Sequence, residues 1–432
     1  MIRTHLIFLI SLAVSYGANG ERILIKAKKI QATPDIIFEP GEILINAGKI
    51  EKIGISISKP KRTETLEWKN LEIYPGLISP GSSLGLVEIN ALRPTRDERE
   101  VGTHTPEIEA WTAVNPDSEL IPVARANGIT HSVIVPLGGL ISGTSSLITL
   151  DGWGIEEITK VKKVAVHLWW PGQTIALSSS SKKNNVKVKS LSEQDKDRKK
   201  SIDEIDEFFA QAIHYFEAKK AKDKNFQYNA SWEALIPILE KKIPLIIHAN
   251  EKREINTAIS WAKKRDIKII ISGARDAWKL AKKLASEEIP VIYRHIFTAS
   301  LHLNDPHDVH FIAPSILASA GVSMAIGLPL GGWAAANQRN LPYHAGHGIA
   351  YGLRRNDAIA SITLNPAKMM GLSKKLGSLE EGKEATFFGC TGDIFDIRSC
   401  VVKMIIEGEE VELASRHTRL FEKYRNRPNL LK

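Results

Sequence analysis

The sequence predicts an α/β fold in which parallel strands are joined by crossover helices. Short apolar runs rich in β-branched residues recur along the middle of the chain, and most are separated by segments whose apolar residues recur at three and four positions. This alternation is typical of parallel sheets. With 432 residues, 43% of them hydrophobic, the chain can also bury a large core. The pattern alone leaves two architectures open, an eight-stranded barrel and a doubly wound sheet.

The predicted elements follow one another in chain order. Alternating apolar and polar residues over 41–54, ending on glycine, predict a β-hairpin. Helix-compatible segments cover 254–265 and 276–286. Strand-like runs cover residues 130–136, 164–168, 243–247, 267–271, 289–293 and 322–326.

The first twenty residues predict a signal peptide. Arg3 precedes an uncharged run over 6–14, and small residues follow up to Gly20. A buried N-terminal strand and an uncleaved anchor are the alternatives. We therefore expect export, to the periplasm or the medium, and no membrane span once the leader is removed, because no other segment is long and apolar enough.

Several motifs carry a resemblance to a known family. After about residue 22 the chain resembles the amidohydrolase superfamily, close to its imidazolonepropionase-like branch. The motifs are PGLISPGSSLGL over 75–86, His248-Ala249-Asn250, Asn340-Leu341-Pro342-Tyr343, TLNPA over 363–367 and LGSLEEGK over 376–383. The resemblance implies hydrolysis of C–N bonds other than peptide bonds, with a divalent metal ion as cofactor.

The resemblance also decides the architecture. It implies a (β/α)8 TIM-like barrel over residues 74–372 and a small discontinuous β-sandwich formed by residues 21–73 and 373–413. A basic tail covers 414–432. Within the barrel, residues 178–200 form a Ser- and Lys-rich insertion, which we interpret as a solvated flexible loop, with an anion-binding lid as the alternative.

In the family, the metal ion is held at the carboxyl ends of the barrel strands. Two histidines follow strand 1, a carboxylated lysine or glutamate may follow strand 4, histidines follow strands 5 and 6, and an aspartate follows strand 8. The ion lowers the pKa of a bound water, and the aspartate takes its proton.

Most of these ligand positions hold other residues here. The strand-1 histidines correspond to Gly81 and Ser83, and the aspartate before them corresponds to Ser79. Strand 5 keeps its histidine, His248. Strand 4 offers neither lysine nor glutamate, and we interpret His167 there as a core or loop histidine, with a side chain pointing into the cavity as the alternative. Ser272 or Gly273 stands at strand 6 and Pro329 at strand 8. One retained ligand does not hold a catalytic ion, so we expect a non-catalytic homologue that binds a ligand or a partner, and no cofactor.

The alternative hypothesis is an atypical amidohydrolase with a degenerate or relocated site for a zinc-like metal, acting on a cyclic amide or a small peptide-like substrate. His248 would then combine with histidines from later loops and helices, whose spacing matches no metal motif: His302, His307, His310, His344 and His347. A Ser–His pair of Ser82 or Ser83 with His248 is a further alternative, although no carboxylate is placed to orient the imidazole.

The charge pattern of the sequence favours some classes of binding partner over others. The formal charge is +9, but lysines are mixed with Glu and Asp, which favours a solvated surface over a nucleic-acid interface. A small-molecule ligand or an active paralogue, in a homo- or hetero-oligomer, is the expected partner. Cys390 and Cys400 are ten residues apart, and we expect two free, buried thiols.

Overall fold

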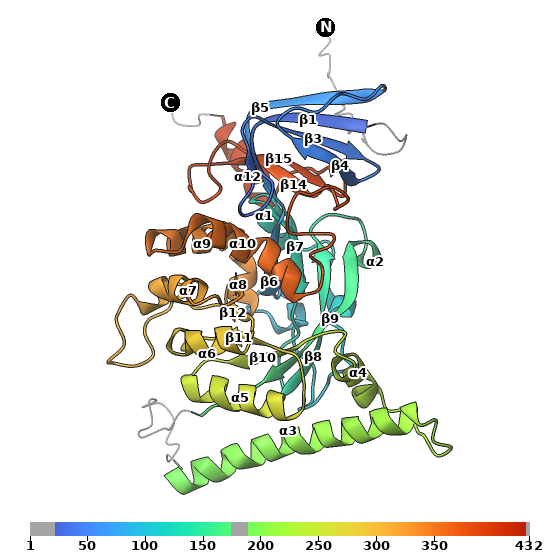
Figure 1. Ribbon diagram of the computed structural model, residues 1–432, viewed down its shortest axis with the longest axis vertical. Helices are drawn as coiled ribbons and strands as arrows, with labels where there is room; N and C mark the ends of the chain where they lie inside the picture. Colours follow the sequence, from blue (N-terminus) through green and yellow to red (C-terminus); the bar gives the residue numbers. More distant parts are fainter. Residues whose placement is uncertain (1–21, 174–188, 429–432) are drawn as a thin grey trace.

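The computed structural model describes residues 22–173 and 189–428. It contains two eight-stranded sheets (Figure 1). The predicted leader and residues 178–188 of the insertion lie outside the described residues. Within the described ranges, no helix combines the length and the apolar character needed to cross a bilayer.

Sheet B forms the nearly closed barrel, and its strands neighbour one another in sequence order. The strands are β6 (Leu77–Ser82), β7 (Ile129–Ile134), β8 (Ile141–Thr149), β9 (Thr159–Trp169), β10 (Leu245–Ala249), β11 (Ile269–Gly273), β12 (Val291–Tyr293) and β13 (Met324–Ile326). This confirms the predicted barrel.

One barrel strand departs from the all-parallel pattern. β8 pairs antiparallel with both β7 and β9, while the other neighbours in the sheet are parallel. The connection from β7 to β8, residues 135–140, has room for a turn but none for a crossover helix. The buried run of β8 was not among the predicted strands, because its serines and threonines dilute the apolar signal.

The helices that cover the barrel are mostly short. They are α1 (Leu120–Arg125), α2 (Ile155–Ile158), α3 (Leu191–Lys220), α4 (Ala230–Leu239), α5 (Lys252–Lys264), α6 (Ala281–Ser286), α7 (Val309–Ser319), α8 (Gly332–Ala336), α9 (Leu341–Ala350), α10 (Arg355–Ile362) and α11 (Leu364–Met369). Four 3-10 turns join them: η1 (Arg93–Thr95), η2 (Ala110–Ala113), η3 (Ala277–Leu280) and η4 (Gln338–Asn340).

Part of the Ser- and Lys-rich insertion is helical, contrary to the expected flexible loop. Residues 191–200 are the first turns of α3, the long helix at the far end of the molecule from sheet A (Figure 1). Ser190 starts the helix with a capping box, in which its hydroxyl accepts from the Glu193 N–H and Glu193 accepts from the Ser190 N–H. Buried Ile205 and Phe209 then hold the helix to the core.

Sheet A is built from both ends of the chain, as expected. The strands are β1 (Arg22–Gln31), β2 (Ile37–Phe38), β3 (Gly41–Asn46), β4 (Lys49–Gly54), β5 (Thr63–Pro75), β14 (Phe387–Cys390), β15 (Val401–Ile406) and β16 (Glu409–Glu410). β14 pairs with the end of β5, which joins the two segments into one continuous sheet with a shared core.

The C-terminal part contains α12 (Arg416–Arg425), which has no buried residue and contacts the rest of the chain through the Arg419–Glu119 ion pair. Both cysteines are free, as expected. Cys390 is buried, but Cys400 is exposed, contrary to the expectation that both would be buried, because it lies in the loop that connects β14 to β15.

Candidate functional site

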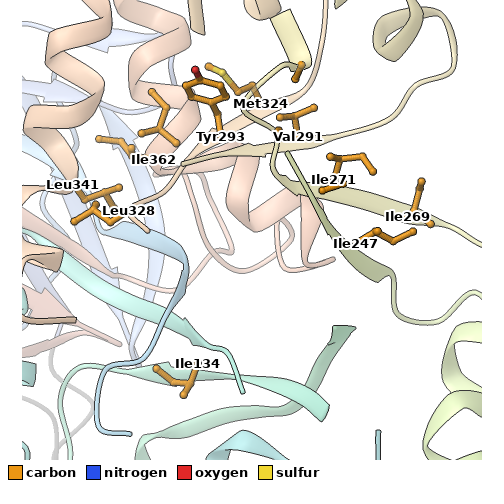
Figure 2. Close-up of a cluster of buried hydrophobic side chains, with 14 of the residues drawn as sticks. Ile134, Ile247, Ile269, Ile271, Val291, Tyr293, Met324, Leu328, Leu341 and Ile362 are labelled. Atoms are coloured by element: carbon orange, nitrogen blue, oxygen red, sulfur yellow. The ribbon is translucent and has the colours of Figure 1, made fainter. Parts of the chain in front are cut away.

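The barrel interior is built in layers by the two-residue period of its strands. One layer is apolar and takes one residue from each strand: Ile78, Val133, Leu147, Ala165, Ile246, Ile270, Ile292 and Ala325. Alternate residues such as Ile247, Ile271 and Val291 belong to the outer cluster, which packs under the helices (Figure 2).

Two positions further along the parallel strands the interior becomes polar. Ile246 is followed by His248, Ile270 by Ser272, Ile292 by Arg294 and Ala165 by His167. All four polar residues are buried. They form a layer at the carboxyl ends of the strands, the end at which TIM barrels carry their active sites. We call this layer the mouth layer.

Arg294 occupies the centre of the mouth layer. Its Nε donates to Ser272 Oγ at 2.9 Å, and its Nη1 donates to the carbonyl oxygens of Gly81 at 3.1 Å and Leu328 at 2.6 Å. Its side chain is 5% exposed, and among the described residues the partners of its guanidinium are hydroxyl and carbonyl oxygens, not carboxylates. Burial lowers the pKa of Arg294 to about 9, so the group is a cation at neutral pH.

These contacts join the ligand positions that the resemblance assigns to different strands. Gly81 lies in β6 at a strand-1 position, Ser272 lies in β11 at the strand-6 position, and Leu328 directly precedes the strand-8 position. β6 and β13 are the end strands of the sheet path. Arg294 therefore connects the two edges of the barrel at its mouth.

Glycine at position 81 is a steric requirement of this arrangement. A Cβ built on Gly81 would lie 2.4 Å from Arg294 Nη2 and 3.1 Å from Val135 Cγ2. Gly327 is also close, because its Cβ would lie 3.0 Å from Arg294 Nη1. A histidine at position 81 is therefore incompatible with the observed position of the guanidinium.

His248, the one retained ligand, is engaged by its neighbours. Its Nε2 lies 2.9 Å from Nδ1 of His167, so one ring donates a hydrogen bond to the other, and Trp169 stacks on its ring with centroids 3.9 Å apart. Burial and the charge of Arg294 lower the pKa of both imidazoles, to about 3 for His167. Both rings are therefore neutral at physiological pH.

The other strand-end positions make local hydrogen bonds. Ser79 Oγ donates to Gln338 Oε1, Ser82 Oγ and Ser132 Oγ share a bond, and Ser83 Oγ accepts from the Gly331 N–H. The alternative Ser–His pair is thus not formed in this structure. Gly273 adopts φ 87 and its Cβ would lie 2.5 Å from Asn250 Oδ1, while Pro329 is exposed beyond β13.

The histidines of the relocated-site hypothesis lie in separate surroundings, and their hydrogen bonds do not reach His248. His302 Nε2 is 3.3 Å from Asp276 Oδ2, and His310 Nδ1 shares a hydrogen bond of 2.8 Å with the Tyr293 hydroxyl. His344 and His347 pack against the Phe297 ring. His307 lies in the turn before α7.

A divalent ion does not fit among the mouth-layer residues. His167 Nδ1 and His248 Nε2 are bonded to each other, and His167 Nε2 is buried without a hydrogen-bond partner among the described residues. One such nitrogen does not hold an ion, and the oxygens of Ser272, Gly81 and Leu328 are already bonded to a cation. A second positive charge beside Arg294 would be repelled in this buried setting.

Two groups elsewhere bring possible metal ligands within 4.8 Å of one another. One is Asp276, His302 and Asp305. The Lys279 ammonium already pairs with both aspartates of this group, with Asp276 at 3.0 Å and with Asp305 at 2.9 Å. The other is His131, Glu384 and Glu407, at the opposite end of the barrel from the mouth layer.

The sequence reasoning missed Arg294 and its neighbour His295. His295 Nε2 donates to Asn250 Oδ1 at 2.8 Å, and burial together with Arg275 lowers its pKa to about 3. The available signal was the two-residue period itself, since Ile292 and Arg294 lie on the same face of a strand that was correctly predicted. A charged residue inside the barrel needs hydrogen-bond partners. The oxygens of Gly81, Ser272 and Leu328, at or beside the altered ligand positions, are those partners.

Comparisons with known proteins agree with the architecture. The sequence profile of the amidohydrolase family matches residues 140–411. The crystal structure of an amidohydrolase from Thermotoga maritima MSB8 superposes with a TM-score of 0.77 at 25% sequence identity, covering 90% of this chain and 99% of that chain. No curated protein matches the sequence.

More distant solved structures share the fold alone. An adenosine deaminase from Xanthomonas campestris with bound zinc gives a TM-score of 0.53 at 13% identity, covering 93% of this chain and 97% of that chain. Molinate hydrolase gives 0.54 at 16% identity, covering 91% and 95%. The imidazolonepropionase-like branch stays a prediction.

Proposed function

Because the chain belongs to the amidohydrolase family, we propose that it is a non-catalytic member whose barrel serves as a binding scaffold. The observation that carries the proposal is the Arg294 guanidinium, which bonds to Gly81, Ser272 and the residue before Pro329, where the family holds its ion. The mouth layer thus has a cation that the chain itself supplies.

A guanidinium supplies only part of what a metal ion supplies. It can donate hydrogen bonds to an anion, but it has no vacant orbital with which to bind a water and lower its pKa. The base is missing as well, because Pro329 stands at the aspartate position. The Nε2 of His248 is bonded to His167 and Trp169 stacks on the ring, so this nitrogen is not free to bind a water.

Apolar side chains around the mouth support a partner role. Phe297 and Leu303 follow β12, and Trp333 is the second residue of α8, which follows β13, so all three lie beyond the carboxyl ends of the strands. Their exposed fractions are 55%, 105% and 81%. Large exposed apolar residues are typical of surfaces that contact another molecule. An active paralogue or a small-molecule ligand, met in the periplasm or outside the cell, is the partner that we propose.

The test combines metal analysis with an activity assay. We expect the purified protein to hydrolyse neither cyclic amides nor dipeptides above the rate without protein, before and after incubation with Zn²⁺. We also expect His248→Ala to leave the metal content unchanged. The matched control is His214→Ala, which removes an exposed histidine of α3.

One result contradicts the proposal and favours the atypical hydrolase. It is a stoichiometric divalent ion that is lost together with hydrolysis in His248→Ala and kept in His214→Ala.

A further inference from the structure

A second polar cluster lies at the other end of the barrel, next to sheet A. His131 is the third residue of β7 and Lys160 is the second residue of β9, so both lie near the beginnings of their strands. With Glu384, Glu407, Lys49 and the side chains around them they line a cavity of about 380 Å³. The cavity is therefore bounded by both sheets.

His131 brings an unused ligand atom into this cluster. The side chain is fully buried, with 0% exposure, and its Nδ1 lies 3.1 Å from Thr130 Oγ1. Its Nε2 has no hydrogen-bond partner among the described residues. Buried polar atoms nearly always have a partner, so this nitrogen indicates a group that the protein chain itself does not supply.

Two carboxylates complete the cluster. One ligand atom each of His131, Glu384 and Glu407 lies within 4.8 Å of the other two. Glu407 pairs with Lys160 at 2.8 Å, whereas no ion pair of Glu384 occurs among the described residues. Two carboxylates this close repel each other, and the ammonium groups of Lys49, Lys160 and Lys375 around the cavity offset part of that repulsion. Burial and Glu407 still raise the pKa of Glu384 above its usual value.

The backbone fixes both glutamates. Glu384 lies just before β14, where the chain bridges to Lys49. Glu407 is in the tight turn between β15 and β16, with φ 53. The turn is pressed against Gly48, whose Cβ would lie 2.6 Å from the Glu407 carbonyl oxygen. The ligand atoms are thus held by rigid elements of sheet A on one side and by β7 on the other.

We propose that His131, Glu384 and Glu407 bind a divalent transition metal ion, zinc in the first instance. One imidazole and two carboxylates form a three-ligand set that suits zinc with a water in the fourth position, whereas Mg²⁺ and Ca²⁺ prefer oxygen ligands alone. The beginnings of TIM-barrel strands serve stability rather than catalysis. The ion would therefore fasten sheet A to the barrel, independently of the function proposed for the mouth.

Lys160 makes the proposal distinctive, because its ammonium group competes with the ion for Glu407. Removing the positive charge should strengthen metal binding, and removing a ligand should weaken it. Adventitious binding to surface histidines predicts neither change.

The experiment titrates chelator-treated full-length protein with Zn²⁺ by calorimetry and follows Co²⁺ binding by its visible absorption. We expect one Zn²⁺ per chain, no comparable binding of Mg²⁺ or Ca²⁺, and a rise in the melting temperature. Glu384→Gln and Glu407→Gln should each weaken binding at least tenfold, and Lys160→Met should tighten it. Circular dichroism checks that each variant is folded.

His302→Ala is the matched control, since it removes a histidine from the other ligand cluster, and it should leave the affinity unchanged. The proposal fails if no saturable site is found, or if both glutamine variants bind Zn²⁺ as the wild type does. Loss of the ion in His248→Ala would instead contradict the proposed function, so the two failures are distinguishable.

Discussion

The steric contact between position 81 and Arg294 can be tested by a double-mutant cycle. In Gly81→Ala the new Cβ would lie 2.4 Å from Nη2, far inside van der Waals contact. The guanidinium has little room to move, because three of its hydrogen bonds are 3.1 Å or shorter and end on buried atoms. Overpacking of this kind costs about 1–3 kcal/mol of unfolding free energy.

Arg294→Met should remove most of that cost. Methionine is flexible and has no fixed polar group near Gly81, so Gly81→Ala in this background should keep only the cost of its φ of 157 and of its contact with Val135, which is the same in both backgrounds. The coupling between the two substitutions should therefore be about 1–2 kcal/mol, well above the 0.5 kcal/mol within which independent sites add. Equilibrium urea unfolding of the four proteins, followed by tryptophan fluorescence and circular dichroism, measures it.

Gly154→Ala provides the matched control, because its Cβ would have nothing within 4 Å. It should show no coupling to Arg294→Met. Additive effects of Gly81→Ala and Arg294→Met would mean that the guanidinium does not fill the space at position 81, and the explanation for the missing histidine would be wrong.

Three further predictions concern stability. Burial holds the pKa of His167 at about 3, below its unfolded value of about 6.5, so the unfolded chain binds more protons and stability falls as the pH drops through 6.5 toward 3. Between pH 7 and 5 this histidine alone should cost about 2 kcal/mol, and His167→Gln should flatten the urea-midpoint profile; an unchanged profile would contradict this. Glu254 accepts backbone N–H bonds from Gln173, Asn250 and Glu251, so Glu254→Gln, which turns an N–H donor toward them, should lower the free energy of unfolding by about 1–3 kcal/mol. Ser190→Ala removes the capping box of α3 and should cost about 1 kcal/mol in the same assay, whereas Ser190→Asp, which can still cap, should cost less.

The sequence predicted the alternating strands and helices because their signal is local and repeated, and the family resemblance decided for the barrel. Each run of β-branched residues was long enough to identify a parallel strand, although the structure shifts the boundaries by a few residues. β8 was missed because Ser142, Thr144, Ser145 and Ser146 are buried by hydrogen bonds to backbone carbonyl groups, which hydrophobicity does not reveal. The start of α3 was missed because its charged first turns are stabilised by capping and by burial further along.

The candidate site was predicted as a set of strand-end positions that lack the family's metal ligands. The substitutions at Gly81, Ser272 and Pro329 could be predicted, because the short sequence around each residue can be matched to a family motif without knowledge of the fold. The contacts of Arg294 could not be predicted, because its partners Gly81 and Leu328 are 213 and 34 positions away. Such contacts exist only once the barrel has closed. The cluster of His131 with Glu384 and Glu407 was hidden for the same reason, since its members come from both domains.

The cation in the mouth layer is covalently part of the polypeptide. An ion held by ligands exchanges with its surroundings, so its occupancy depends on supply, on competing metals and on chelators. Arg294 is incorporated into each chain at synthesis, so a chelator cannot remove it and another metal cannot take its place. The positive charge of Arg294 at neutral pH is therefore inherited with the sequence, and the shape that its hydrogen bonds give the mouth layer should be the same in a metal-starved cell and in a metal-rich one.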